Sequence, residues 1–431
     1  MKDVLILGQN IQGLIAAGLL AALGDDVSVI EFQNEPFTNV AHIPFAIPNH
    51  IIQRLELEKY GLEIPETPVN PFKKLPFYSG LTKLINTFNS LEDGRPAYNE
   101  KSWRDAWNIF ELSRILSDCD SDIQSLFSQI GSASLIELLD VAQLSEQDKT
   151  EIVAHCILGA KTDPYVQGSA ASILPAMMVF EQKDCVVFQG HIENLVEALT
   201  QSAAANNVKF HTDNGIQSID THNNAIEKIT TVNGDELSAN HYVLDYDPVW
   251  LFRDYLMDYK IAPAFKNRIF PKQNLKECVH IRADISLGGG ISAPSMQYIK
   301  IARHDMKNTG VSSHPMVSIV GNDIIAQYFD ADADDGQIVS AVRDVIIKNN
   351  PDINHGDLNL KLLPMATQFG QPTFVGAMPL LQLIKVISGY HSIGYDLPLR
   401  NLLIAGYGQG AASHYHTHEG GIRVANLLQS L

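Results

Sequence analysis

Three apolar runs follow one another at the start of the chain. Asp3–Gly8 is short and continuously hydrophobic, which is typical of a strand buried on both faces of a parallel sheet. Ile11–Leu23 is longer and rich in Ala and Leu, as in a buried helix, and Val27–Glu31 is again a short apolar run. The order predicts a strand, a turn, a helix and a second strand within about thirty residues.

The pattern then changes twice along the chain. Prolines recur between residues 36 and 77, which predicts an irregular excursion. Helical periodicity follows, and it predicts a helical cap or substrate domain from Trp103–Leu116, Ser121–Gln129 and Ser132–Val141. After residue 185 the periodicity predicts an amphipathic helix at Ile192–Ala205. Strand-like runs with hairpin turns come next, at Val208–Thr212, Ile216–Thr221, Ala225–Val232 and Glu236–Leu244.

The last third of the chain predicts a mixed segment and then a return to the opening pattern. Extended runs at Val317–Val320 and Ile324–Phe329 precede one clear helix, Gly336–Lys348. The end of the chain predicts a buried strand at Asn401–Ala405 and a helix from about Gly420 to Leu428. No internal repeat interrupts this order.

The turn after the first strand carries the residues that suggest a ligand. Gly8-Gln9-Asn10-Ile11-Gln12-Gly13 stands in the place of the dinucleotide fingerprint Gly-x-Gly-x-x-Gly. The first glycine permits a tight turn, the middle one lets a pyrophosphate approach, and the last lets helix and strand pack closely. Asn10 replaces the middle glycine, so its side chain takes up space near the phosphates. Glu31 ends the second strand and can accept hydrogen bonds from a ribose, which favours FAD or NAD over NADP.

These features predict an α/β fold in which a Rossmann-like FAD/NAD(P)-binding domain is interleaved with an α+β substrate domain. The predicted nucleotide domain comprises residues 1–70, 185–250 and 390–431, and the substrate or cap domain comprises residues 71–184 and 251–389. A Rossmann-like fold that no longer binds a nucleotide stays the alternative.

The composition of the chain limits the kinds of partner that we expect the protein to bind. The net charge of -18 repels phosphate backbones and anionic membranes, so we expect no nucleic acid partner. Four cysteines, Cys119, Cys156, Cys185 and Cys278, form no CxxC pair, which favours neither a disulfide framework nor a zinc site and suggests a cytoplasmic protein. Leu14–Leu23 follows a strand and lacks a cleavage pattern, so it is interpreted as structure. No run reaches the ~20 apolar residues of a membrane span, although a peripheral contact stays open.

Seven segments carry a resemblance to a known family. They are Asp3–Phe32, Ser134–Asp140, Ile157–Ala171, Gly190–Leu199, Tyr242–Pro248, Phe374–Pro379 and Asn401–Gly406. In this order they resemble the flavoprotein superfamily of phytoene desaturases and amine oxidases, and within it the pyridine nucleotide-disulfide oxidoreductase domain-containing protein 2 group. The chain departs from the family pattern in having no glycine in Phe32–Asn39 and in placing histidines in the loop 406–419.

The resemblance implies where FAD would lie. The pyrophosphate would rest on Gly8, Asn10, Ile11, Gln12 and Gly13, the ribose at Glu31, and the adenine against the strand that contains Ile216. The flavin would lie near the residues of the last loop and helix, Gly406, Glu419, Gly420, Gly421 and Ile422. In such an arrangement the N-terminus of the last helix would stabilise negative charge on the reduced flavin.

The resemblance also implies an activity. We expect an FAD-dependent oxidoreductase that removes a hydride from a hydrophobic or amine substrate and passes electrons to oxygen, a quinone or another acceptor. No local motif identifies its catalytic residues. Two alternatives remain: a binding or regulatory protein without flavin, comparable to the Rab GDP-dissociation inhibitors, and an enzyme that uses free NAD transiently.

Two further motifs invite a metal hypothesis. His414, His416 and His418 would face one way on an extended strand, ~7 Å apart at Cα for successive members, but no carboxylate or cysteine completes a site. We therefore expect a polar loop and no metal, with His416 and His418 as possible proton carriers beside the flavin. The acidic run Asp330–Gly336 lacks the closing Glu of a calcium loop and predicts a helix N-terminus instead.

Overall fold

The computed structural model describes most of the two ends and the centre of the chain. The described residues are 2–30, 45–66, 69–93, 120–160, 164, 167–181, 184–188, 192–212, 215–245, 251–256, 259, 278–285, 297–299, 316–320, 323–327, 335–349, 358–363, 398–405 and 417–430. The helix expected at Trp103–Leu116 lies outside them.

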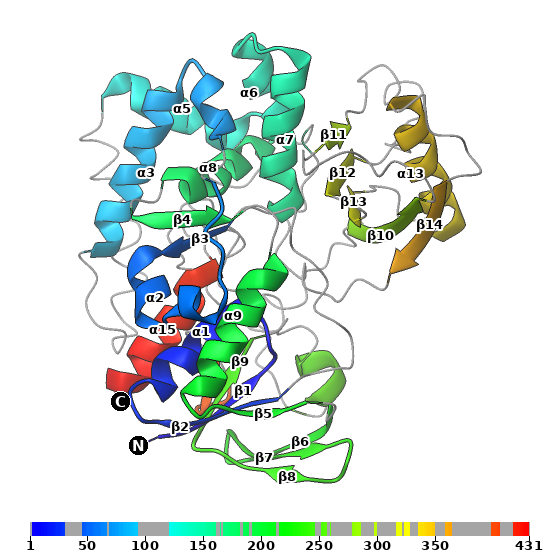
Figure 1. Cartoon of the computed structure of the whole chain (residues 1–431). Helices are drawn as coiled ribbons and strands as arrows, with labels where there is room; N and C mark the ends of the chain where they lie inside the picture. Colours follow the sequence, from blue (N-terminus) through cyan, green and yellow to red (C-terminus); the bar gives the residue numbers. More distant parts are fainter. Residues whose placement is uncertain are drawn as a thin grey trace.

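A five-stranded parallel sheet organises the part of the chain that surrounds the glycine turn (Figure 1). Its order is β15-β9-β1-β2-β5, and every neighbouring pair is parallel. The strands are β1 (Asp3–Leu7), β2 (Asp26–Ile30), β5 (Lys209–His211), β9 (His241–Leu244) and β15 (Leu402–Ile404). The predicted Rossmann-like α/β fold is thus confirmed, with strands drawn from the start, middle and end of the sequence.

Each face of the sheet is covered by a different layer. Val4 and Ile6 of β1 point into a core shared with α1 (Ile11–Ala21), α9 (Ile192–Ala205) and α15 (Thr417–Ser430). Leu5 and Leu7 point the other way, into a core shared with a small antiparallel sheet. Successive residues of a strand face opposite sides, so a strand covered on both faces must be continuously hydrophobic, as the Asp3–Gly8 run predicted.

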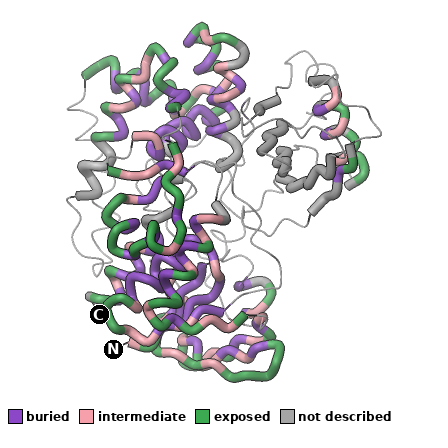
Figure 2. Tube along the Cα trace, in the orientation of Figure 1, coloured by how far each residue is buried: buried purple, intermediate pink, exposed green. Residues whose placement is uncertain are grey.

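The helix α1 is buried on all sides. Every residue from Ile11 to Leu20 is buried, because α9 and α15 pack against it and the sheet lies beneath it. Figure 2 shows the buried residues concentrated in this part of the molecule. A helix without a polar face is the pattern expected for the centre of a domain.

The small antiparallel sheet consists of β6 (Ile216–His222), β7 (Ala225–Thr231) and β8 (Glu236–Leu237). The prediction of one strand over Glu236–Leu244 was wrong, because β8 ends at Leu237 and β9 begins only at His241. The two strands belong to different sheets: β8 pairs with β7, whereas β9 pairs with β1. The Asn240 amide, which donates to the Asp3 carbonyl at 3.1 Å, already belongs to the parallel sheet.

A helical layer lies beyond the parallel sheet (Figure 1). It contains α3 (Tyr78–Asp93), α5 (Ser121–Ser132), α6 (Leu135–Val141), α7 (Glu146–Ala160) and α8 (Ile173–Glu181), with a 3-10 turn η3 (Ser169–Ser172). The helices predicted around residues 121–129 and 132–141 are confirmed. The second begins later than predicted, because Ser134 is its N-cap and forms a capping box with Glu137.

The segment expected to be irregular contains regular elements where the structure describes it. They are β3 (Phe45–Pro48), α2 (Asn49–Arg54), η1 (Leu57–Tyr60) and η2 (Pro71–Lys74), and β3 pairs antiparallel with β4 (Cys185–Phe188). Pro48 is the N-cap residue of α2, and Pro71 is the first residue of η2. Proline favours helix starts, so these prolines mark element boundaries and not an irregular loop.

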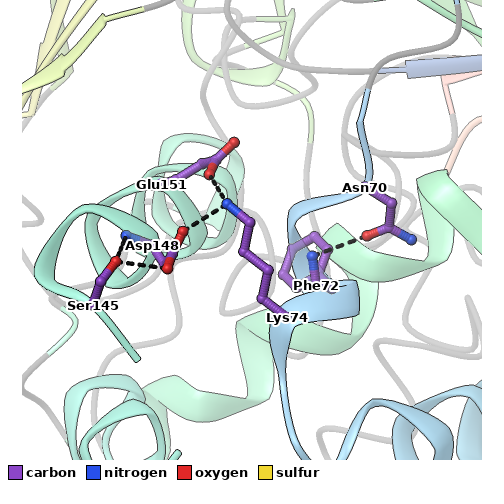
Figure 3. Close-up of polar contacts among 6 residues, drawn as sticks. All are labelled: Asn70, Phe72, Lys74, Ser145, Asp148 and Glu151. Atoms are coloured by element: carbon purple, nitrogen blue, oxygen red, sulfur yellow. Dashed lines mark hydrogen bonds and ion pairs between the residues drawn. The ribbon is translucent and has the colours of Figure 1, made fainter. Parts of the chain in front are cut away.

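Polar contacts hold η2 against α7 (Figure 3). Asn70 Oδ1 accepts from the Phe72 amide at 3.0 Å, and this places the fully buried Phe72 ring. Lys74 Nζ reaches Asp148 at 2.6 Å and Glu151 at 3.0 Å, both on α7. Hydrogen bonds to these two carboxylates raise the pKa of Lys74, and Lys74 in turn lowers the pKa of Asp148. Lys74, Asp148 and Glu151 are partly exposed, so their ion pairs contribute little to the free energy of folding. Their main effect is to align η2 with α7.

A second mixed unit follows in the sequence. Its antiparallel sheet has the order β11-β12-β13-β10-β14, and α13 (Asp335–Asn349) contacts β11 and β14. The strands are β10 (Cys278–Ile285), β11 (Gln297–Ile299), β12 (Met316–Val320), β13 (Asp323–Gln327) and β14 (Leu358–Leu363), and a π turn at Leu251–Tyr255 precedes them. The division into interleaved domains stays a prediction. None of the helices in the described ranges is both long and apolar enough to span a membrane.

Candidate functional site

The glycine turn is built against one residue, Asp245, which directly follows β9. Gly8 has a φ of 110° and donates its amide to the Ile30 carbonyl at 2.9 Å. A Cβ added to Gly8 would lie 2.6 Å from the Asp245 carbonyl oxygen, and one added to Gly13 would lie 2.5 Å from its Oδ2. Only glycine fits at either position, so close packing against Asp245 explains why the first and last residues of the fingerprint are glycines.

Asp245 is held by hydrogen bonds from three directions. Its amide donates to the Leu7 carbonyl at 2.8 Å, which continues the pairing of β9 with β1. Its Oδ2 accepts from the Gly13 amide at 2.7 Å, and its carbonyl accepts from Asn10 Nδ2 at 2.6 Å. The carboxyl therefore lies at the N-terminus of α1, the position where Rossmann-like folds bind an anion.

The Asn10 side chain lies inside the fold. It was expected to take up space beside the phosphates, but it is 8% exposed and is directed at the Asp245 carbonyl. Asn10 is the N-cap residue of α1, yet its side chain makes no cap hydrogen bond to the helix. The Asp245 carboxyl group supplies that bond instead, by accepting from the Gly13 amide.

The charge state of Asp245 follows from its burial. The residue is fully buried, and its Oδ1 has no hydrogen-bond partner in the described part of the chain. Burial raises the pKa of Asp245 to about 8, although the backbone amides of Gly13 and Asn10 lower it in part. At neutral pH the carboxyl is therefore mostly protonated.

The first turn of α1 also presents amide donors. The amides of Ile11 and Gln12 make no hydrogen bond to the described residues, and both residues are nearly fully buried. Amides in the first turn have no partner inside their helix, and the positive end of the helix dipole lies there. The arrangement suits a phosphate oxygen.

The last helix begins earlier than predicted, at Thr417, so Gly420 and Gly421 lie in its second turn and not at its N-terminus. A Cβ on Gly420 would lie 1.7 Å from the Ala405 carbonyl oxygen and 1.9 Å from Gln12 Oε1. A Cβ on Gly421 would lie 2.3 Å from the Gln12 carbonyl oxygen. The glycine pair lets α15 approach α1 and the end of β15.

The remaining predicted site residues are placed as follows. Ile216 begins β6 and is buried in the core below the parallel sheet, where its carbonyl accepts from the Tyr255 hydroxyl at 3.1 Å. Ile422 is partly buried against the core of α1. Glu31 and Gly406 lie outside the described residues, and Glu419 is in α15 with its side chain outside them. The structure thus brings together the glycine turn and the Gly420–Gly421 pair.

The structure describes little of the histidine segment that suggested a metal. His418 lies in α15 and not on an extended strand, because the helix begins at Thr417. His414 and His416 lie outside the described residues. Among the residues that are described, no group of three metal-binding side chains comes together.

Sequence reasoning missed Asp245. The segment Tyr242–Pro248 entered only through the family resemblance. The residue nevertheless carries a recognisable pattern: an acidic residue directly after a buried parallel strand lies at the carboxyl edge of the sheet, where ligands bind in folds of this kind.

We predict that Gly420→Ala strongly destabilises the protein. The added methyl overlaps the Ala405 carbonyl and the Gln12 side chain, so α15 must move away from α1. Overpacking of this kind costs about 1–3 kcal/mol or more. Urea unfolding measures the loss, with Asn426→Ala on the exposed side of the same helix as the control. Equal stability of the two variants would contradict the close helix crossing.

We predict that Asp245→Asn becomes more stable than the wild type as pH rises from about 4 to about 8. The unfolded carboxyl loses its proton near its ordinary pKa of 3.8, whereas the folded one keeps it to about 8. The folded wild type therefore loses stability over that window, by at most about 1.4 kcal/mol per pH unit, and the neutral amide does not. Unfolding free energies at several pH values test this. A difference between the two proteins that does not change with pH would refute it.

Comparison with known proteins agrees with this geometry at the level of the fold. No protein-family model matches the sequence, and no curated protein matches it. Solved structures are similar along the whole chain. An oxidoreductase from Methanosarcina mazei has 13% identity and a TM-score of 0.50, over 98% of this chain and 99% of that one.

Two more structures show the same likeness. Putrescine oxidase bound to putrescine has 11% identity and a TM-score of 0.50, over 100% of this chain and 99% of that one. A protein from Pyrococcus furiosus has 12% identity and a TM-score of 0.51, over 99% and 97%. At these identities the likeness establishes a shared fold. The chain therefore shares the fold of these three structures along nearly its full length.

Proposed function

We propose that the protein is an FAD-dependent oxidoreductase that removes a hydride from an amine or another hydrophobic substrate. The observation that carries this proposal is the position of α1 in the sheet. The chain leaves β1 between β2 and β9, which lie on opposite sides of it, so α1 begins at the point where the strand order reverses. Open α/β sheets bind their ligands at this crevice.

The residues at the crevice fit a dinucleotide. The turn at Gly8 brings the backbone close, and the amides of Ile11 and Gln12 would face the pyrophosphate at the N-terminus of α1. In this proposal Glu31 holds the ribose, Ile216 supports the adenine side, and the flavin lies toward Gly406 and the start of α15. A bound oxidised flavin supplies the hydride acceptor.

The proposal includes the interleaved domains. The nucleotide domain would comprise residues 1–70, 185–250 and 390–431, and the substrate domain residues 71–184 and 251–389. The joining of β1, β9 and β15 in one sheet supports the first assignment.

An amine is the favoured substrate class. The net charge of -18 produces a negative field that attracts protonated amines. The similar fold of putrescine oxidase supports the same choice by analogy. The alternative substrate class is a neutral hydrophobic molecule, as in the desaturases that the sequence resembles.

One observation favours a second function, a binding protein without flavin. The Gly13 amide already donates to Asp245. The space beside Gly420 and Gly421 is occupied by residues of α1 and by Ala405, which follows β15. A fold stabilised by its own carboxylate does not require a bound phosphate to complete α1. The two functions differ in whether FAD raises the stability of the protein.

We predict that FAD raises the thermal midpoint and that riboflavin does not. A ligand that binds only the folded state stabilises it by about 2.7 kcal/mol at a concentration of 100 Kd. Riboflavin lacks the phosphates that the α1 N-terminus would bind, so it is the matched control. The purified protein should also show a visible flavin absorbance. A colourless protein whose midpoint is unchanged by saturating FAD would favour the binding-protein function.

We predict that an amine bleaches the bound flavin under anaerobic conditions. Hydride transfer to the flavin removes its visible absorbance without any electron acceptor. Putrescine and simple monoamines are the test substrates, and their quaternary ammonium analogues, which cannot form an imine, are the controls. If a conjugated alkene bleaches the flavin and no amine does, the substrate is a neutral hydrophobic molecule, as in the desaturases, and not an amine.

A further inference from the structure

The Asp245 carboxyl combines three features at one place. It is fully buried, it lies at the N-terminus of the eleven-residue helix α1, and one of its oxygens has no hydrogen-bond partner among the residues that the structure describes. Oδ2 accepts from the Gly13 amide at 2.7 Å, whereas Oδ1 makes no hydrogen bond to the residues that the structure describes. Buried polar atoms are rarely left unpaired in folded proteins, so Oδ1 requires an explanation.

The described helix and strands around Asp245 place no charged residue from α1 or β15 beside it. α1 carries no charged residue, and neither does β15. Asp3 of β1 and His241 of β9 stand at the opposite ends of their strands. α15 carries His418, Glu419 and Arg423, and the side chains of the first two lie outside the described residues.

An unpaired buried carboxylate is costly, so the group keeps its proton. Burial raises the pKa of Asp245 to about 8, which agrees with this argument. Because the Gly13 amide donates to Oδ2, that oxygen is the acceptor of the pair and the proton resides on Oδ1. Oδ1 is then a hydroxyl donor for which the described residues provide no acceptor, next to the helix end that favours anions.

We propose that Asp245 binds the dinucleotide as a neutral acid, with its Oδ1 hydroxyl donating a hydrogen bond to a phosphate oxygen at the N-terminus of α1. This inference rests on the proposed binding of FAD and adds a ligand-binding residue to it. A buried carboxylic acid can act as a donor in this way when its surroundings keep it neutral. The same group, once ionised, repels the phosphate.

The proposal predicts a specific dependence of FAD affinity on pH. Below about pH 8 the wild type holds the proton and binds FAD with a constant Kd, and above it the Kd rises up to about tenfold per pH unit. Asp245→Asn keeps an acceptor for the Gly13 amide and an amide donor for the phosphate. Its Kd is therefore expected to match the low-pH wild type and to stay constant to about pH 9.

Two further variants complete the design. Asp245→Ala has no donor and is expected to bind FAD roughly tenfold or more weakly than the wild type at low pH, with no pH dependence. Asp220→Asn changes an exposed acid on β6 and is expected to follow the wild-type profile. The measurement is equilibrium titration of the full-length, flavin-depleted protein, monitored by flavin fluorescence. Circular dichroism establishes that each variant is folded.

The outcomes separate the two proposals. If FAD binds to no variant at any pH, the dinucleotide function itself is refuted. If FAD binds but the wild type and Asp245→Asn share one pH profile, Asp245 is not the donor. Binding to folded Asp245→Ala as tight as to the wild type overturns the inference as well. Should the alanine variant not fold, the comparison of Asp245→Asn with the wild type decides alone.

Discussion

The contact between Asp245 and the start of α1 is the interaction on which the region around the parallel sheet depends. It joins residues 232 positions apart, through the hydrogen bond from the Gly13 amide to Oδ2. The amide of Asp245 simultaneously continues the pairing of β9 with β1. A single residue thus sets how β1, α1 and β9 meet, and the absence of side chains at Gly8 and Gly13 is a consequence of that close approach.

The same constraint explains why the neighbouring helices fit as they do. With α1 drawn close to the sheet, α15 can reach it only through a surface without side chains, which Gly420 and Gly421 provide. The two positions that the family resemblance assigned to the flavin therefore have a packing function in this chain.

Elements specified by local pattern were predictable from the sequence, and elements specified by distant partners were not. The helix at Ile192–Ala205 was predicted with its observed limits, because its amphipathic periodicity is complete within the segment. The break between β8 and β9 was missed, because nothing local shows that His241 pairs with the first strand of the chain. The start of α15 was missed for a related reason: the glycine pair resembles a helix start but serves a helix crossing. Asp245 was missed because its role arises only when β9 returns beside β1.

Asn10 shows how the degraded fingerprint and the buried acid belong together. An N-cap asparagine ordinarily accepts a hydrogen bond from an amide of its own helix. Here Asn10 instead donates to the Asp245 carbonyl at 2.6 Å, and the Asp245 carboxyl takes over the cap by accepting from Gly13, the third residue of α1. Asp245 performs the capping function that the Asn10 side chain would otherwise perform, and Asn10 in turn holds the Asp245 backbone, so neither can be interpreted alone. A glycine at position 10 would let a ligand approach more closely but would leave the Asp245 carbonyl without this donor. The replacement of the middle glycine is therefore explained by the acid that the turn encloses, and it is not by itself evidence that the nucleotide site has been lost.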